Sequence, residues 1–252
     1  MNNYYEKLKE LLAADYFCDA ADFDIEENVL TEAESQAKGR VYLRKKPFFR
    51  MVTTGTNAVI TADPVLDSFL VRFMKGGHGY SLFETPKLAS LEKELNKHGQ
   101  TLSNIQHMYL PCRNTEPMLD IPVKWFRDKE INRFYGNKNF PNAICSRPSK
   151  ERPDRLAVCA YDDKKIIGMA GGSEDAEGWI QIGIDVLPEY RSKGIGTYLV
   201  TLLKNQITEL GMIPFYGTST GNIHSANIAL SSGFSPAWTE IGSKPLNKIM
   251  MY

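Results

Sequence analysis

PEYRSKGIGTYL, residues 188–199, joins an expected strand to an expected helix. A proline, an aromatic residue and two cations lead to two glycines, after which apolar residues recur with helical spacing. A glycine inside a helix costs about 1 kcal/mol relative to alanine. Because Gly194 and Gly196 both lie at the start of this helix, we predict that something approaches the backbone closely there.

The joint has the composition of a backbone site for phosphate. The start of a helix presents unpaired N–H groups and about half a positive charge. Without a Cβ at Gly194 and Gly196, a bulky anion could reach those N–H groups, and Arg191 and Lys193 add positive charge beside them. A tight turn with solvated cations is the alternative. Two glycines within one helical turn favour phosphate.

Two common nucleotide motifs do not fit this joint. A phosphate-binding loop of the Walker type needs G-x-x-x-x-G-K-[ST], and no Lys-Ser/Thr pair follows these glycines. A dinucleotide fingerprint needs Gly or Ala where the chain has Leu199. The phosphate must therefore belong to another class of ligand.

The flanking segments predict alternating strands and helices. In residues 179–187, Ile180, Ile182, Ile184 and Val186 fall on one face of a strand, and Gln181, Gly183 and Asp185 on the other. An apolar stripe from Ile195 to Leu210 predicts a helix that ends at Gly211. Asp162-Asp163 predicts a hairpin turn. Asn222 is the expected cap of a short helix that Gly233 closes.

Two signatures in these segments carry a family resemblance. Arg191-Ser-Lys-Gly194-Ile-Gly196 matches the [QR]-x-x-G-x-[GA] signature of the GNAT N-acetyltransferase superfamily. Downstream, Asn222, Ser225 and Gly233-Phe234 match its N-x-x-[AS]…GF segment. The chain resembles in particular a bacterial GNAT subgroup that carries an extra N-terminal domain. The match is strong over residues 179–234, looser over 121–178 and absent from the first half.

The resemblance implies an α/β (α+β) fold whose mixed central sheet splays open to admit acetyl-CoA. Pantetheine would bond to the main chain of Asp185, Val186 and Leu187, with a main-chain N–H near Val186 as oxyanion donor. Asn222 and Ser225 would face the pantetheine arm. The pyrophosphate would lie on the N–H groups of the joint, which comprises Arg191, Ser192, Lys193, Gly194, Ile195, Gly196 and Thr197.

Catalytic candidates are fewer. Direct attack on a thioester needs a neutral amine, so a base or a water chain must take a proton. The strand positions where relatives carry the base are Ile180 and Ile182, which leaves Asp185 as the nearest carboxylate of the strand, with a structural role as its alternative. Glu174, Asp175 and Glu177 are expected in a solvated loop. Ala229 stands where relatives have a tyrosine acid, so Tyr216 is the nearest candidate acid, or else a core tyrosine.

Composition bounds the remaining possibilities. The 252 residues suit two domains, which we place at 1–112 (an α/β domain) and 113–252 (the GNAT domain). Thirty Lys+Arg balance thirty Asp+Glu, so no net charge favours nucleic acid or a membrane. The N-terminus has no signal-peptide core, and four scattered cysteines predict reduced thiols without a metal site, as in a cytoplasmic protein.

These observations predict an acetyl-CoA-dependent N-acetyltransferase that acts on a primary amine by direct attack. Its partners would be acetyl-CoA and an amine acceptor that the sequence does not identify, and a homodimer stays open. The alternative is a non-catalytic acyl-CoA-binding or sensor module, because the relatives' tyrosine and upstream carboxylate are absent.

Overall fold

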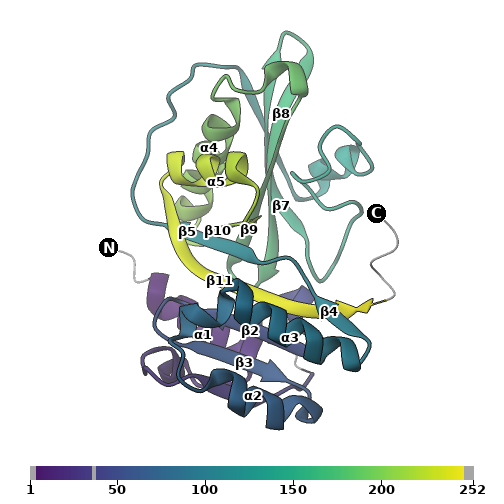
Figure 1. Cartoon of the computed structure of the whole chain (residues 1–252). Coiled ribbons are helices and arrows are strands. Elements are labelled where there is room, and N and C mark those ends of the chain that lie inside the picture. Colours follow the sequence, from purple (N-terminus) through teal and green to yellow (C-terminus); the bar gives the residue numbers. More distant parts are fainter. Residues whose placement is uncertain (1–3, 36–37, 247–252) are drawn as a thin grey trace. The chain divides into compact units, whose positions relative to one another are not determined.

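The computed structural model describes residues 4–35 and 38–246, and their path is drawn in Figure 1. The chain divides into two compact units. Unit 1 comprises Met1–His107 and Ala237–Tyr252, and unit 2 comprises Met108–Pro236. The expected division at residue 112 assigned the whole C-terminal end to the second domain, whereas the described residues from 237 onward group with unit 1.

The described residues of unit 1 form a small sheet and three α-helices. Strand β3 pairs in parallel with β1 and antiparallel with β2, and β2 pairs antiparallel with β11. Strand β11 also pairs antiparallel with β4. The elements are α1 (Tyr4–Tyr16), β1 (Val29–Glu32), β2 (Phe49–Thr53), β3 (Ala58–Ala62), α2 (Asp67–Met74), α3 (Thr85–Lys97), β4 (Gln100–Leu102) and β11 (Phe234–Pro245).

The core of unit 1 explains why these segments fold. All five residues of β2 and of β3 are buried, as expected for strands covered on both faces. The segment from Pro64 forms a short 3-10 turn and then α2, and both its Leu66 and its Leu70 are fully buried. At Gly79 a Cβ would lie 2.0 Å from the carbonyl carbon of Asn57, so this glycine permits a close backbone approach.

A buried charge cluster ties together distant parts of unit 1. The side chain of Arg40 is fully buried and donates its Nε to Asp15, also fully buried, at 2.6 Å. Its Nη1 and Nη2 donate to Glu240 on β11 at 3.0 and 2.7 Å. The backbone N–H of Arg40 also donates to Asp15, at 2.8 Å. Each of the three guanidinium nitrogens therefore donates at least one hydrogen bond, as a buried charge requires.

Unit 2 is built on a mixed sheet with two helices. Strands β6, β7, β8 and β9 pair antiparallel in that order, β9 pairs in parallel with β10, and β10 neighbours β5. The elements are β5 (Gln106–Pro111), β6 (Val123–Arg127), β7 (Asp154–Asp162), β8 (Lys165–Ala176), β9 (Trp179–Val186), α4 (Ile195–Glu209), β10 (Ile213–Ser219) and α5 (Ile223–Ser231). The expected mixed α/β class is confirmed.

Short 3-10 turns complete the described fold. They span Ala20–Phe23, Val41–Leu43, Pro64–Leu66, Gly79–Phe83, Asp128–Phe134 and Pro188–Tyr190. The hairpin expected at Asp162-Asp163 joins β7 to β8, and Asp163 adopts a positive φ of 51° that a tight turn requires. No helix within residues 4–35 and 38–246 is long and apolar enough to cross a membrane.

Helix α4 covers the sheet with the stripe expected from the sequence. Ile195, Leu199, Leu203 and Ile207 are at most 3% exposed and belong to one core cluster with Ile180 and Ile182 of β9. Leu210 was expected to extend this stripe but is 46% exposed, because the helix ends at Glu209 and the chain turns away at Gly211. The core therefore lies between α4 and the sheet.

Candidate functional site

Strands β9 and β10 of unit 2 are parallel and pair over only part of their length. The pairing of β9 with β10 covers four residue pairs and ends at Ile182 and Tyr216. Strand β9 nevertheless continues to Val186, and β10 continues to Ser219. The opposite edge of β9 stays paired with β8 as far as Val186. Among the described residues, no strand pairs with residues 183–186 on the edge that β10 leaves.

The direction of the main-chain groups along this open edge follows from one hydrogen bond. Leu187 donates its N–H to Ile167 on β8 at 2.9 Å. Successive residues of a strand present their N–H and C=O groups to opposite edges. The N–H and C=O of Val186 therefore point into the gap. Of the three residues expected to bond pantetheine, Val186 has this orientation, whereas Leu187 faces β8.

The open edge leads directly to the start of α4. Between them the chain turns through Pro188–Tyr190, then adopts positive φ at Ser192 (60°) and at Gly194 (79°), the N-cap. The first backbone bond of the helix runs from the N–H of Tyr198 to the carbonyl of Gly194, at 2.9 Å. The N–H groups of residues 195–197 precede that bond and have no helical acceptor. An anion could accept hydrogen bonds there.

Glycine is needed at positions 194 and 196 of the joint for different structural reasons. Gly194 needs its left-handed conformation, in which L side chains are strained. Gly196 is buried, and a Cβ on it would lie 2.9 Å from Cδ1 of Ile228 on α5 and 3.8 Å from Cγ2 of Val186. Our expectation that a side chain at Gly196 would point into the phosphate path is therefore wrong. Its missing Cβ lets α4 and α5 pack closely.

Both expected cations lie beside the joint and are exposed. Arg191 donates its Nε to the carbonyl of Val186 at 3.0 Å, which occupies the oxygen that β10 would otherwise have paired. Lys193 places its Nζ 5.0 Å from the centre of the Tyr190 ring. The Tyr190 hydroxyl donates to Asp162 at 2.6 Å, which holds the ring in place. Arg191 thus orders the end of β9, in addition to supplying charge.

The second motif lies at the start of α5. Asn222 accepts a hydrogen bond from the N–H of Ser225 at 3.2 Å, which confirms it as the helix cap. The hydroxyl of Ser225 is 2.8 Å from that of Tyr216, at the point where β9 and β10 separate. Burial raises the pKa of Tyr216, which is 2% exposed. Ala229 lies in the core.

A comparison with known families decides the class of this unit. The model of the acetyltransferase (GNAT) family matches residues 117–234. The chain contains a GNAT acetyltransferase domain. The matched segment holds the open edge of β9, the joint and the capped helix α5, and residues 1–116 lie outside it.

Solved structures that resemble the chain do so at low identity. A GCN5-related N-acetyltransferase-like protein from Streptococcus suis has a TM-score of 0.47 and 11% identity, over 78% of this chain and 83% of that one. A GNAT-family acetyltransferase from Colwellia psychrerythraea has a TM-score of 0.43 and 15% identity, over 62% of this chain and 61% of that one. A Salmonella typhimurium protein solved with its cofactor acetyl-CoA has a TM-score of 0.36 and 13% identity, over 52% of this chain and 96% of that one.

The chain spans 66%, 61% and 63% of the length of the first three solved structures that it matches. No curated protein matches the chain.

The carboxylate of Asp185, on β9 of the GNAT domain, is bound to a loop. It accepts hydrogen bonds from the backbone N–H of Asn142 at 2.6 Å, from Nδ2 of Asn142 at 2.7 Å and from the N–H of Ala143 at 2.9 Å. The same loop lies directly on two glycines, since a Cβ on Gly183 would be 1.8 Å from the Asn142 oxygen, and one on Gly171 would be 2.0 Å from that of Ala143. Asp185 thus anchors this loop to the face opposite Val186.

A buried polar cluster on the GNAT domain was missed by the sequence analysis. Asp175 is fully buried on β8 and ion-paired with Arg152, which also donates to Gln181 at 2.8 Å. We expected Asp175 in a solvated loop, and that is wrong, because β8 extends to Ala176. No local pattern marks an acid that pairs with an arginine across a strand. Within the described residues no group of three or more His, Cys, Asp or Glu side chains could hold a metal ion.

Proposed function

We propose that the protein is an acetyl-CoA-dependent N-acetyltransferase that transfers the acetyl group to a primary amine by direct attack. The observation that carries this proposal is the open edge of β9, which ends beside a helix start with free N–H groups. A pantetheine arm needs main-chain partners along a strand, and a pyrophosphate needs backbone N–H groups near positive charge. The GNAT domain offers both in one continuous segment.

The geometry supports the following roles for individual residues. The N–H groups of residues 195–197, with Gly194 in its left-handed conformation, would bind the pyrophosphate. Ser192 and Lys193 lie on the exposed rim of the same loop. Val186 would bond pantetheine, and Asn222 and Ser225 would line the arm from the start of α5. The thioester of acetyl-CoA supplies the acetyl group.

For the acyl transfer itself, Val186 is the proposed oxyanion donor. Its N–H points into the gap, so it could donate to the negative oxygen that develops when the amine attacks the thioester carbon. The new C–N bond forms as the C–S bond breaks, and the thiolate leaves. A single such donor contributes about 2.7–4 kcal/mol in well-studied enzymes.

The amine must lose a proton, and the structure favours water as the acceptor. Both carboxylate oxygens of Asp185 accept hydrogen bonds from residues 142–143, which leaves this carboxylate a positioning role. The thiolate is expected to leave without a dedicated acid, and Tyr216 is the nearest candidate for that role if one is needed. A thiol has an unperturbed pKa of about 8.5, so its release as thiolate costs only about 2 kcal/mol at pH 7.

Replacing Tyr216 with phenylalanine is therefore expected to lower kcat by less than about tenfold, well below the 10²–10⁴ typical of a lost acid or base. The variant loses only the hydroxyl that contacts Ser225. Steady-state kinetics over a range of pH values checks this. A hundredfold loss with the basic limb of the pH profile gone, in a folded variant, would identify Tyr216 as the acid.

Release of CoA from acetyl-CoA across a panel of amines tests the proposed function. The panel should span amino acids, polyamines, aminoglycosides and peptides, with mass spectrometry to identify the acetylated product. The proposal expects at least one amine to raise CoA release above the rate of hydrolysis. Tight acetyl-CoA binding without transfer to any amine would favour the non-catalytic acyl-CoA-binding module instead.

A further inference from the structure

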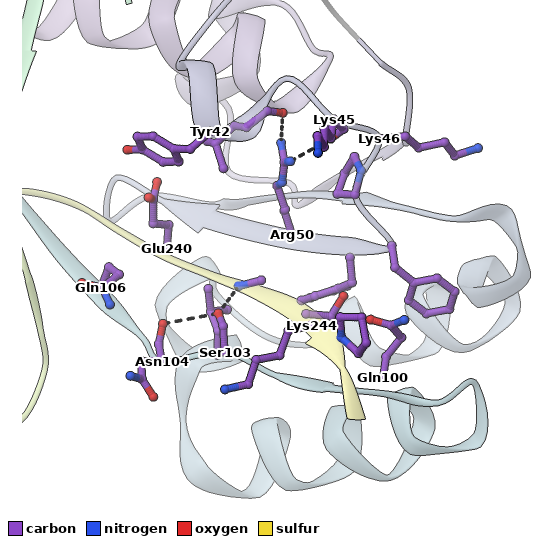
Figure 2. Close-up of a pocket in the computed structure, with 18 of the residues that line it drawn as sticks. Tyr42, Lys45, Lys46, Arg50, Gln100, Ser103, Asn104, Gln106, Glu240 and Lys244 are labelled. Atoms are coloured by element: carbon purple, nitrogen blue, oxygen red, sulfur yellow. Dashed lines mark hydrogen bonds between the residues drawn. The ribbon is translucent and has the colours of Figure 1, made fainter. Parts of the chain in front are cut away.

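Unit 1 contains a cavity of about 600 Å³ that the acetyl-transfer chemistry does not use. It lies over β2, β4 and the C-terminal end of β11, and Figure 2 shows side chains from all three strands and from residues 42–48 around it. Sites for small molecules span about 300–1,000 Å³. The cavity therefore has room for a ligand of metabolite size.

The charges around this cavity are predominantly positive. Lys45, Lys46 and Lys244 line it, and none of the three has an acidic partner within the part of the chain that the structure describes. In Figure 2 the amine of Lys244 extends from β11 towards Asn104. The amine of Lys46 points away from the other two in the same view, so the three ammonium groups are spread along the rim. Together they give the cavity a positive potential that attracts an anion.

The single acid of the lining does not oppose that attraction. Both oxygens of Glu240 accept hydrogen bonds from the Arg40 guanidinium, and Nε1 of Trp238 donates to one of them at 2.9 Å. The Glu240 side chain is only 12% exposed. Arg40 is shared between Glu240 and Asp15, so this buried cluster keeps one net negative charge. The three lysines and Arg50 outnumber it, so the cations set the electrostatic character of the cavity.

The cavity wall is held in place by hydrogen bonds. The guanidinium of Arg50 donates to the carbonyls of Leu43 and Lys45 at 2.6 and 2.9 Å, which fixes the segment that carries Lys45 and Lys46. On the opposite side, Ser103 exchanges hydrogen bonds with Gly242, its hydroxyl accepting from the Gly242 N–H at 3.0 Å. These bonds order the rim without any ligand.

Apolar side chains complete the lining. They include the buried Pro47, Phe49 and Ile241 and the half-buried Phe48. We propose that unit 1 binds a small organic anion, with a carboxylate or phosphate at Lys244, in the positive potential to which Lys45 and Lys46 also contribute, and an apolar body against Phe48. This site lies wholly in unit 1 and does not depend on acetyl transfer.

Isothermal titration calorimetry of the full chain tests this site, with CoA in all solutions to occupy the GNAT domain. The probes are phenyl phosphate and benzoate, which differ in their anionic group, with inorganic phosphate and neutral benzyl alcohol as references. We expect at least one aromatic anion to bind at a single site, more tightly than either reference. Lys244→Glu should weaken it about tenfold or more, because it replaces attraction with repulsion.

The matched control is Lys93→Glu, which makes the same charge change at an exposed position of α3 outside the cavity. Its Kd should equal that of the unmodified chain. Equal weakening by both variants, equal binding of benzyl alcohol or inorganic phosphate, or no binding of either aromatic anion would overturn the proposal. If Lys244→Glu does not fold, Lys244→Gln takes its place, with a smaller loss expected and an unchanged Kd again contradicting the site.

Discussion

Gly196→Val is expected to raise the Kd of acetyl-CoA at least about tenfold, or about 1.4 kcal/mol. The cause is packing between helices. A Cβ at this position would already lie 2.9 Å from Cδ1 of Ile228, and valine adds two methyl groups to it. The Ile228 side chain must then shift, and the overlap with the valine methyl groups that its rotation does not relieve pushes on α5, which carries Asn222 and Ser225. Calorimetry with acetyl-CoA measures the effect.

Two further variants make this prediction specific. Gly196→Val combined with Ile228→Ala should recover most of the affinity, because the shortened side chain makes room for the valine. Thr201→Val places a valine on the buried face of the same helix at nearly constant volume and should leave the Kd unchanged. Gly196→Val with the affinity of the unmodified chain would contradict the proposed role of this segment.

Asp15→Ala is expected to lower the free energy of unfolding by about 3–5 kcal/mol. Asp15 and Arg40 have fully buried side chains, and removing the carboxylate leaves part of a buried guanidinium without its acceptor. The backbone N–H of Arg40 would lose its acceptor as well. Urea denaturation of the full chain, followed by circular dichroism, measures the loss.

Glu10→Ala is the matched control for Asp15→Ala, since Glu10 lies on the same helix α1 and is exposed. Its effect should stay within about 0.5 kcal/mol. A loss below about 1 kcal/mol for Asp15→Ala would mean that water or another group replaces the carboxylate, and the buried cluster would then not hold unit 1 together.

In unit 2 the sequence predicted helices and strands well where the periodicity of apolar residues and the positions of glycines indicate the same element. The alternation of apolar residues gave the burial of β9, and the stripe from Ile195 gave the buried face of α4. The cap at Asn222 needed only a local side-chain bond to Ser225. Such features depend on neighbours in the sequence, so the sequence contains their cause.

Pairings between remote segments could not be predicted in this way. Strand β11 pairs with β2, where Thr239 lies opposite Thr53, although the two segments are far apart in the sequence. The reason for Gly196 likewise lies in Ile228, on another helix. Nor does any pattern connect Arg40 with Asp15 and Glu240. These contacts follow from tertiary packing, which a single sequence does not encode locally.

Amide hydrogen exchange with and without acetyl-CoA tests most directly the claim that the edge of β9 and the start of α4 bind this molecule. The N–H groups of Val186 and of residues 195–197 have no strand or helix acceptor, so they should exchange quickly in the free protein. Saturating acetyl-CoA should slow their exchange strongly, while α1 and α3 stay unchanged. Slowing confined to other parts of the chain, with Val186 and residues 195–197 unaffected, would contradict the claim.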